Sequence, residues 1–225
     1  MVEILLDTAD LEVIKRYNDI YDITGVTTNP TIISREKSEF FPTLLKIREI
    51  IGEKQLHVQV SAADSEGMVK EAERIVSLLG KNTYVKIPAV EEGIRAIKIL
   101  KSKDFKVTAT VIFSLQQAAM AANVGADYVA PYFNRISDSF GSGEQVVSDI
   151  AELFATHGIG TKLLVASFRN TDQIMRCFLA GAHAVTAPPE FYTKMLKNPF
   201  VDEIVERFSR DWTEAYGGKN ICELD

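Results

Sequence analysis

The chain of 225 residues has few of the features that mark secreted, metal-binding or membrane-spanning proteins. Its only cysteines, Cys177 and Cys222, lack a paired spacing, which argues against a disulfide framework and against a cysteine zinc site. The three histidines, His57, His157 and His183, also lack the spacing of a metal motif, so we interpret them as structural residues. No apolar stretch approaches the roughly 18 residues of a membrane span, and no secretory signal is found at the N-terminus. We therefore expect a cytoplasmic protein.

Positive charge is scarce as well. The 25 Lys and Arg residues are outnumbered by 31 Asp and Glu, which gives a net charge of -6 without a long basic run. This balance argues against nucleic acids and membrane surfaces as partners, and a small anionic substrate would need a local group of cations. A Pro/Gly/Ser-rich linker and low-complexity segments are also missing, so we expect a single domain over residues 1–225.

What the chain does contain is a regular alternation of strands and helices. Eight short β-rich runs recur at residues 3–6, 25–28, 56–60, 84–87, 106–112, 128–131, 162–166 and 184–187. Helical patterns separate them, the clearest having apolar residues Met68, Ala72, Ile75, Val76 and Leu79 on one face. At 114–117 and 142–145 a serine is followed three residues later by a glutamine, which fits the capping box of a helix N-terminus.

Eight alternating units predict an α/β protein with a closed (β/α)8 TIM barrel. An open doubly wound sheet is the alternative, but that fold usually carries a glycine-rich phosphate loop after its first strand, and no such motif occurs here. An additional amphipathic C-terminal helix is predicted over residues 199–216. We expect its apolar face to pack either on its own barrel or on a neighbouring subunit.

Lys86 is the most informative residue, because it lies within the apolar run Tyr84–Pro88. Burial lowers the pKa of an amine, so a desolvated lysine can act as a neutral nucleophile and form an imine with a carbonyl substrate. The alternative is a lysine that extends to solvent or pairs with a carboxylate. Lys106 and Lys162 stand at the starts of their strands, where we expect a lysine to meet solvent.

Polar residues recur where the predicted strands end, which is where barrel enzymes place their chemistry. These are Asp7, Thr27, Asn29, Gln59, Lys86, Thr110, Tyr132, Arg135, Ser167 and Arg169. Simpler interpretations exist for several of them: Asp7 could cap the next helix, and Asn29-Pro30 could be an ordinary turn. Gln59 could be a core amide and Tyr132 an interface aromatic. The recurrence at one face of the barrel favours a functional site.

Five motifs together resemble a known family. They are Leu-Asp-Thr-Ala-Asp (6–10), Gly-Val-Thr-Thr-Asn-Pro-Thr (25–31), Val-Lys-Ile-Pro (85–88), Ala-Pro-Tyr-Phe-Asn-Arg (130–135) and Ala-Ser-Phe (166–168). The chain resembles, from Met1 to about Trp212, the small transaldolase family that includes fructose-6-phosphate aldolase. The resemblance implies a (β/α)8 barrel, a Schiff base on Lys86 and no metal or organic cofactor. It also implies ring-shaped homo-oligomers, pentamers or decamers, in which the C-terminal helix reaches a neighbour.

Two positions distinguish the branches of this family. The aldolase branch is similar to this chain in having Gln59 and Tyr132, where transaldolases commonly have Glu and Phe. The resemblance therefore implies cleavage or formation of fructose 6-phosphate from dihydroxyacetone and glyceraldehyde 3-phosphate. The alternative is a transaldolase that moves a dihydroxyacetone unit between sugar phosphates in the pentose phosphate pathway.

The resemblance and the residue chemistry suggest a role for each candidate. Lys86 would form the iminium, Asp7 would shuttle protons or orient hydroxyls, and Gln59, Thr110 and Tyr132 would hold the water that takes and returns a proton. Thr27 and Asn29 would bind donor hydroxyls, and Arg135, Ser167 and Arg169 would bind the phosphate. A barrel that binds sugar phosphates without catalysis, and a Schiff-base aldolase for 2-keto acids or deoxyribose phosphate, are the remaining alternatives.

Overall fold

The computed structural model of the chain describes residues 2–37 and 39–224. Its strands are β1 Glu3–Asp7, β2 Gly25–Thr27, β3 Gln55–Gln59, β4 Thr83–Pro88, β5 Lys106–Ile112, β6 Tyr128–Pro131, β7 Lys162–Val165 and β8 Ala184–Ala187. They close into a barrel in sequence order, with β8 paired in parallel to β1. The prediction of a single (β/α)8 TIM barrel with a C-terminal helix is confirmed, and the predicted strands agree with the observed ones to within a residue at each end.

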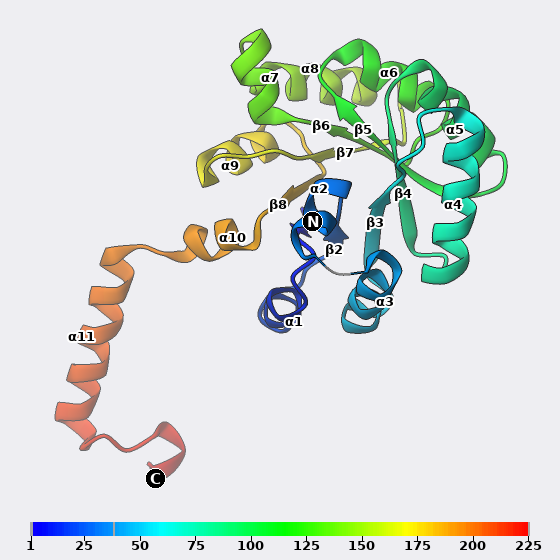
Figure 1. Ribbon diagram of the computed structural model, residues 1–225. Helices are drawn as coiled ribbons and strands as arrows, with labels where there is room; N and C mark the ends of the chain where they lie inside the picture. Colours follow the sequence, from blue (N-terminus) through cyan, green and yellow to red (C-terminus); the bar gives the residue numbers. More distant parts are fainter. Residues whose placement is uncertain (1, 38, 225) are drawn as a thin grey trace. The chain divides into compact units, whose positions relative to one another are not determined.

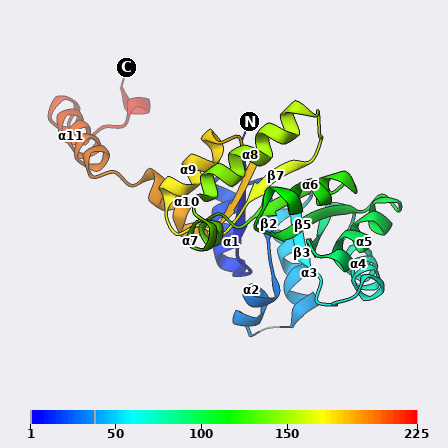
Figure 2. The same cartoon turned by 90° about the horizontal axis from the view of Figure 1, so that it is seen from above.

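Helices follow the strands and form the outer layer of the barrel (Figure 1), which the view from above also shows (Figure 2). They are α1 Leu11–Ile20, α2 Pro30–Arg35, α3 Phe40–Ile51, α4 Ser65–Leu79, α5 Glu91–Lys101, α6 Leu115–Asn123, α7 Phe133–Phe140, α8 Gly143–Thr156 and α9 Thr171–Leu179. After β8 the chain continues with α10 Pro189–Leu196, α11 Pro199–Tyr216 and a 3₁₀ turn at Ile221–Glu223. On α4 the predicted apolar residues Met68, Ala72, Ile75 and Leu79 are buried, and Val76 is partly buried. The amphipathic pattern of the sequence therefore marks the face that covers the strands.

The capping boxes predicted at two helix starts form only in part. Ser114 and Ser142 cap α6 and α8, because each hydroxyl accepts from the backbone N–H three residues on. The glutamine side chains do not return to the capping residue. Gln145 donates to Asp149, and the Gln117 carbonyl oxygen accepts from Phe113 N at 2.9 Å. The prediction was wrong for the glutamines because closer or better-placed partners are available in the folded chain.

Strand β5 is irregular near its carboxyl end. Its pairing with β6 shifts register between Ala109 and Ile112, which is a β-bulge. Val111, inside the bulge, has a φ of 59°. A β-branched residue rarely adopts this left-handed conformation, so the bulge is a strained segment that neighbouring contacts must hold.

Hydrogen bonds connect the polar side chains that fill the amino-terminal end of the barrel interior. The Tyr128 hydroxyl donates to Glu3 at 2.6 Å and accepts from the Gln55 amide at 3.1 Å. The Gln55 carbonyl oxygen lies 3.0 Å from His57 Nε2, and His57 Nδ1 lies 2.9 Å from Thr108 Oγ1. Because an amide oxygen only accepts, His57 carries its proton on Nε2 and accepts from Thr108 on Nδ1. His57 is therefore a satisfied structural histidine, as predicted.

The chain divides into two compact units at the boundary between Phe191 and Tyr192. The second unit contains α11, whose bounds agree with the predicted helix. Its apolar residues Phe200, Val201, Ile204 and Phe208 are exposed in the single chain. Among the described residues, no helix is both long and apolar enough to span a bilayer. The expected cytoplasmic location stays a prediction.

Candidate active site

A cavity of ≈ 160 Å³ lies at the carboxyl ends of the strands. Its lining consists of Asp7, Thr27, Asn29, Lys86, Thr110, Ala130, Tyr132, Arg135, Leu164, Ala166, Ser167 and Thr186. Parallel strands bring their carboxyl ends to one face of a barrel, so side chains distant in sequence converge there. Eight of the ten residues predicted for the site line this cavity.

Lys86 is held at the wall of this cavity by the strand that carries it. Its side chain comes from β4 and is only 6% exposed. The ammonium nitrogen donates to the backbone carbonyl of Thr28 at 2.8 Å. Within the described residues it forms no ion pair, and it does not extend to solvent. Neither simpler arrangement considered for this lysine is therefore found.

Burial shifts the protonation of Lys86 and of Asp7 in opposite directions. Desolvation lowers the pKa of the Lys86 amine, and the attraction of Asp7 opposes that shift only in part. Desolvation raises the pKa of the Asp7 carboxyl, against the opposing effects of Lys86 and of a hydrogen bond from Thr27. Both directions favour the uncharged forms. The site thus contains an amine that is more easily deprotonated than an ordinary lysine and a carboxyl that more readily keeps a proton.

Asp7 belongs to a short chain of hydrogen bonds between three strands. The Thr27 hydroxyl donates to Asp7 Oδ1 at 2.7 Å and lies 2.6 Å from the Thr186 hydroxyl. Because Thr27 uses its hydrogen on Asp7, Thr186 must donate to Thr27. The helix cap considered for Asp7 is made instead by Asp10, which accepts from Val13 N. Asp7 is thereby oriented toward the cavity.

Thr186 is a cavity residue that the sequence analysis did not select. It is buried in β8 and has 3% of its surface exposed. Thr186 is the one polar residue of the otherwise apolar run 184–187. Because side chains alternate along a strand, it lies on the same face as Ala184. A polar residue at an inward position near the carboxyl end of the last strand was the signal that could have identified it.

Two hydroxyls face each other on neighbouring strands of the cavity. Thr110 Oγ1 lies 3.2 Å from the Tyr132 hydroxyl. Tyr132 stands at the end of β6, and the Arg135 guanidinium lies over its ring, 5.3 Å from the centroid. Such a pair can hold a water molecule or a substrate hydroxyl between or beside its oxygens. The same arrangement places a permanent cation next to the polar end of the cavity.

Asn29 and Ser167 reach the cavity from loops that follow strands. Asn29 also caps α2, because its side-chain oxygen accepts from Ile32 N at 2.9 Å. Asn29-Pro30 is therefore the start of a helix, not the ordinary turn that was considered, and Asn29 lines the cavity as well. Ser167 has a φ of 67°, and its carbonyl accepts from Asn134 N at 2.9 Å. That contact connects the loop after β7 to the helix that carries Arg135.

Gln59 does not line this cavity, contrary to the prediction. It lines a separate, mostly apolar groove of ≈ 570 Å³ beside Phe40, Phe41 and Ile75. The hydrogen bond from Lys86 to Thr28 connects β4 to the end of β2, across the intervening strand that carries Gln59. The Gln59 carbonyl oxygen is buried and has no hydrogen-bond partner among the described residues.

Arg169 is also directed elsewhere. Its guanidinium pairs with Asp138 at 2.9 Å, and the cavity lining does not include it. Asp138 accepts in addition from the Asn134 amide at 2.9 Å. The carboxylate therefore neutralises the arginine outside the cavity, an ion pair that the linear sequence did not suggest. Among the described residues that line the cavity, Arg135 is the arginine that could bind a phosphate.

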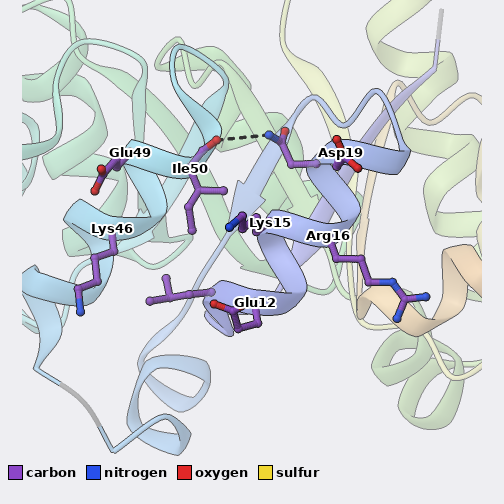
Figure 3. Close-up of a pocket in the computed structure, with 9 residues that line it drawn as sticks. Glu12, Lys15, Arg16, Asp19, Lys46, Glu49 and Ile50 are labelled. Atoms are coloured by element: carbon purple, nitrogen blue, oxygen red, sulfur yellow. Dashed lines mark hydrogen bonds between the residues drawn. The ribbon is translucent and has the colours of Figure 1, made fainter.

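Two further observations concern other kinds of site. A hollow of ≈ 970 Å³ lies between α1 and α3 and is lined by residues of both charges, including Glu12, Lys15, Arg16 and Lys46. Figure 3 shows these side chains on helices of the outer layer, so they do not belong to the strand ends. Among the described residues, no group of three or more His, Cys, Asp or Glu side chains is arranged to hold a metal ion.

Comparison with known proteins gives consistent results over the chain. The family model described as Transaldolase/Fructose-6-phosphate aldolase matches residues 4–218. A probable fructose-6-phosphate aldolase from Streptococcus pneumoniae is 37% identical over 98% of this chain and 100% of that protein. A probable transaldolase from Agathobacter rectalis is 38% identical over 96% of this chain and 100% of that protein. Thiamine phosphate pyrophosphorylase from Pyrococcus furiosus shares the fold, with a TM-score of 0.60 at 15% identity, over 83% of this chain and 85% of that one.

Proposed function

Because the chain belongs to the transaldolase/fructose-6-phosphate aldolase family, we propose that it is a Schiff-base aldolase that cleaves or forms fructose 6-phosphate from dihydroxyacetone and glyceraldehyde 3-phosphate. The observation that carries this proposal is the buried Lys86 amine at the cavity, which has no ion pair among the described residues and whose pKa is lowered by burial. A neutral amine can attack a ketone, whereas an ammonium cannot.

The proposed reaction begins with attack of Lys86 Nζ on the C2 ketone of fructose 6-phosphate. Loss of water gives an iminium, which accepts the electron pair of the C3–C4 bond as that bond breaks. The products are glyceraldehyde 3-phosphate and an enamine of dihydroxyacetone on the lysine. Asp7 would give a proton to the leaving hydroxyl and take one back during hydrolysis, a role that suits a carboxyl with a raised pKa.

Thr110 and Tyr132 are proposed to complete the proton transfers. The C4 hydroxyl must lose its proton as the bond breaks, and the enamine carbon must gain one before hydrolysis releases dihydroxyacetone. A water molecule bound by these two hydroxyls, which lie 3.2 Å apart, would carry both protons. Gln59, which is not among the residues that line the cavity, is assigned no part in this step.

Arg135 and Ser167 are proposed to bind the phosphate of the aldehyde. A guanidinium offers two parallel donors to phosphate oxygens, and a hydroxyl adds a third. Thr27 and Asn29, on the β2 side, are placed to contact the hydroxyls of the dihydroxyacetone unit. In this proposal the dihydroxyacetone unit and the aldehyde phosphate bind on opposite sides of Lys86.

A transaldolase is the second candidate, and the names of the relatives support both activities. The chemistry differs only in whether the enamine receives a proton or a second aldehyde. The Tyr132 hydroxyl supports the aldolase, because it can polarise the water that protonates the enamine, as a phenyl ring cannot.

The discriminating experiment measures turnover of fructose 6-phosphate with and without erythrose 4-phosphate. An aldolase releases glyceraldehyde 3-phosphate at the same rate without the acceptor, whereas a transaldolase needs it. In parallel, borohydride reduction during turnover should add the dihydroxyacetone unit to Lys86, as measured by peptide mass spectrometry. Labelling at another lysine would overturn the assignment of Lys86, and no labelling at all would favour a barrel that only binds sugar phosphates.

The oligomer is part of the same proposal. Phe200 and Phe208 on α11 are 73% and 60% exposed in the single chain, and an apolar helix face of this kind needs a partner in water. We expect a neighbouring subunit to cover it in a ring of identical chains. Light scattering of the wild type and of Phe208→Glu tests this, and a monomeric wild type would contradict it.

A further inference from the structure

Gln117 lies outside the cavity, yet its amide contacts the backbone of two strands that supply cavity residues. Its carbonyl oxygen accepts from Phe113 N at 2.9 Å. Its nitrogen donates to the carbonyl of Ala89 at 3.2 Å and to that of Val111 at 3.4 Å. An amide has two N–H donors and one carbonyl, so every group of this side chain is used.

The three backbone groups lie at the ends of β4 and β5. Ala89 directly follows β4, the strand of Lys86, and its own N–H donates to the Thr110 carbonyl at 2.8 Å. Val111 follows Thr110 on the adjacent strand β5, and Phe113 lies just past the end of that strand. One side chain from α6 therefore connects the backbone just after the lysine to the backbone just after the threonine.

The contact with Val111 stabilises a conformation that the residue would not adopt alone. Val111 has a φ of 59°, inside the bulge that interrupts the pairing of β5 with β6. A bulge next to a site re-aims the neighbouring side chain, and a strained residue persists only where its surroundings hold it. The Ile112 carbonyl, one residue on, accepts from Tyr132 N at 3.1 Å. The bulge thus influences the position of the Thr110 hydroxyl relative to the Tyr132 hydroxyl.

We propose that Gln117 is a positioning residue, whose amide holds the bulge of β5 so that the Thr110 hydroxyl stays against the Tyr132 hydroxyl. The inference rests on the proposed function, since it assigns Gln117 to the proton transfers of that reaction. It separates two parts of the site. Formation of the Schiff base depends on Lys86 and Asp7, whereas proton transfer at the hydroxyl pair depends on the bulge.

The test compares Gln117→Ala with Gln116→Ala, a matched control on the same helix whose side chain is exposed. In Gln117→Ala we expect kcat for fructose 6-phosphate to fall by roughly ten- to a hundredfold, because a small misplacement of a reacting group has effects of that size. KM and the fraction of Lys86 trapped by borohydride should stay at the wild-type values. Gln116→Ala should match the wild type in all three measurements.

A double-mutant cycle with Val111→Gly tests the physical cause. Glycine adopts a φ of about 60° without strain, so the bulge needs less support once Val111 is replaced. Gln117→Ala combined with Val111→Gly should therefore be faster than Gln117→Ala alone by about three- to tenfold. Gln117→Glu keeps the acceptor for Phe113 N but loses both donors, so it should show the kcat loss even where the alanine variant folds poorly.

Two outcomes would overturn the inference. One is a wild-type kcat in Gln117→Ala or Gln117→Glu. The other is a trapped fraction that falls in proportion to kcat, together with no gain from Val111→Gly, since that pattern indicates general damage to the barrel. Failure to trap Lys86 in the wild type would instead overturn the proposed function, and this inference with it.

Discussion

Two lysines at opposite ends of the barrel form contacts with other strands, but their nitrogens meet different partners. Lys86 lies near the carboxyl end of β4, and Lys162 lies at the amino end of β7. Lys162 pairs with the Glu3 carboxylate, and its side chain is 45% exposed. Lys86 donates to a neutral carbonyl and is almost fully buried. Desolvation lowers the pKa of the Lys86 amine, so this buried amine gives up its proton more easily than an ordinary lysine. The comparison teaches that reactivity here depends on the partner of the nitrogen and on its burial.

The aromatic residues at the two ends differ in the same way. At the amino end, Tyr128 is hydrogen-bonded to Glu3 and Gln55, and His57 stacks on Tyr84 with ring centroids 4.6 Å apart. Burial, with a smaller effect of the Lys86 charge, holds the pKa of His57 well below its ordinary value, so this histidine is neutral. At the carboxyl end, the Tyr132 hydroxyl lies 3.2 Å from the Thr110 hydroxyl beside the cavity that both residues line. The amino end is a satisfied network, and the carboxyl end keeps hydrogen-bonding capacity for a ligand.

The largest expected effect separates the two lysines. Lys86→Met should abolish borohydride trapping and lower turnover of fructose 6-phosphate by roughly 10⁴-fold or more, because the nucleophile is gone. Lys162→Met should keep wild-type trapping and turnover, since its amine lies at the other end of the barrel. Peptide mass spectrometry and initial rates measure both. Comparable losses in the two variants would contradict the comparison.

The next effect separates the two tyrosines. Tyr132→Phe should lower cleavage of fructose 6-phosphate by about a hundredfold, because the water that protonates the enamine loses one ligand. Transfer to erythrose 4-phosphate still needs the proton transfer at the C4 hydroxyl but needs no proton at the enamine carbon, so it should fall much less. Tyr128→Phe is the control and should change neither rate. An equal loss of cleavage and transfer in Tyr132→Phe would remove the role given to its hydroxyl.

A third prediction concerns pH. Burial lowers the pKa of Lys86, so its neutral form appears at lower pH than in an ordinary lysine. Below that lowered pKa the rate of Schiff-base formation should fall about tenfold for each pH unit, and above it the rate should level off. Rapid-quench borohydride trapping between pH 5 and about 10 measures the midpoint. A midpoint at the ordinary value of a lysine amine would show that burial has no effect on Lys86.

The smallest expected effect is on stability at the amino end. Lys162→Met removes a partly exposed ion pair, which contributes about 0.2–1 kcal/mol to the free energy of unfolding in typical proteins. Urea denaturation monitored by circular dichroism should show a loss in this range, reduced further in high salt because the charges are screened. A loss of several kcal/mol would mean that the pair acts as a buried one.

The prediction of the barrel and of most of its cavity depended on patterns that are local in sequence. Alternation of strands and helices defined the fold, and the rule that strand ends converge brought Asp7, Lys86 and Tyr132 to one place. The family resemblance added their roles, which stay predictions. These inferences needed no knowledge of how individual side chains turn.

The failures concern side chains whose direction depends on partners far away in sequence. Arg169 pairs with Asp138, and Gln59 lines a different groove, beside Phe40 and Phe41. Gln117 matched a helix-capping pattern, yet it serves backbone groups of two neighbouring strands. In each case a tertiary contact decided among several local possibilities, and only the folded chain contains that contact.

The carbonyl that Lys86 contacts has a consequence for stereochemistry. An iminium nitrogen that bears the substrate carbon keeps one hydrogen, so in the proposed cycle it can still donate to Thr28 O after the Schiff base forms. That hydrogen bond would restrict rotation of the adduct and select one of its two geometric isomers, so that a new bond forms on one face of the enamine. Since the acceptor belongs to the peptide backbone, replacing the Thr28 side chain should leave the configuration of the product unchanged.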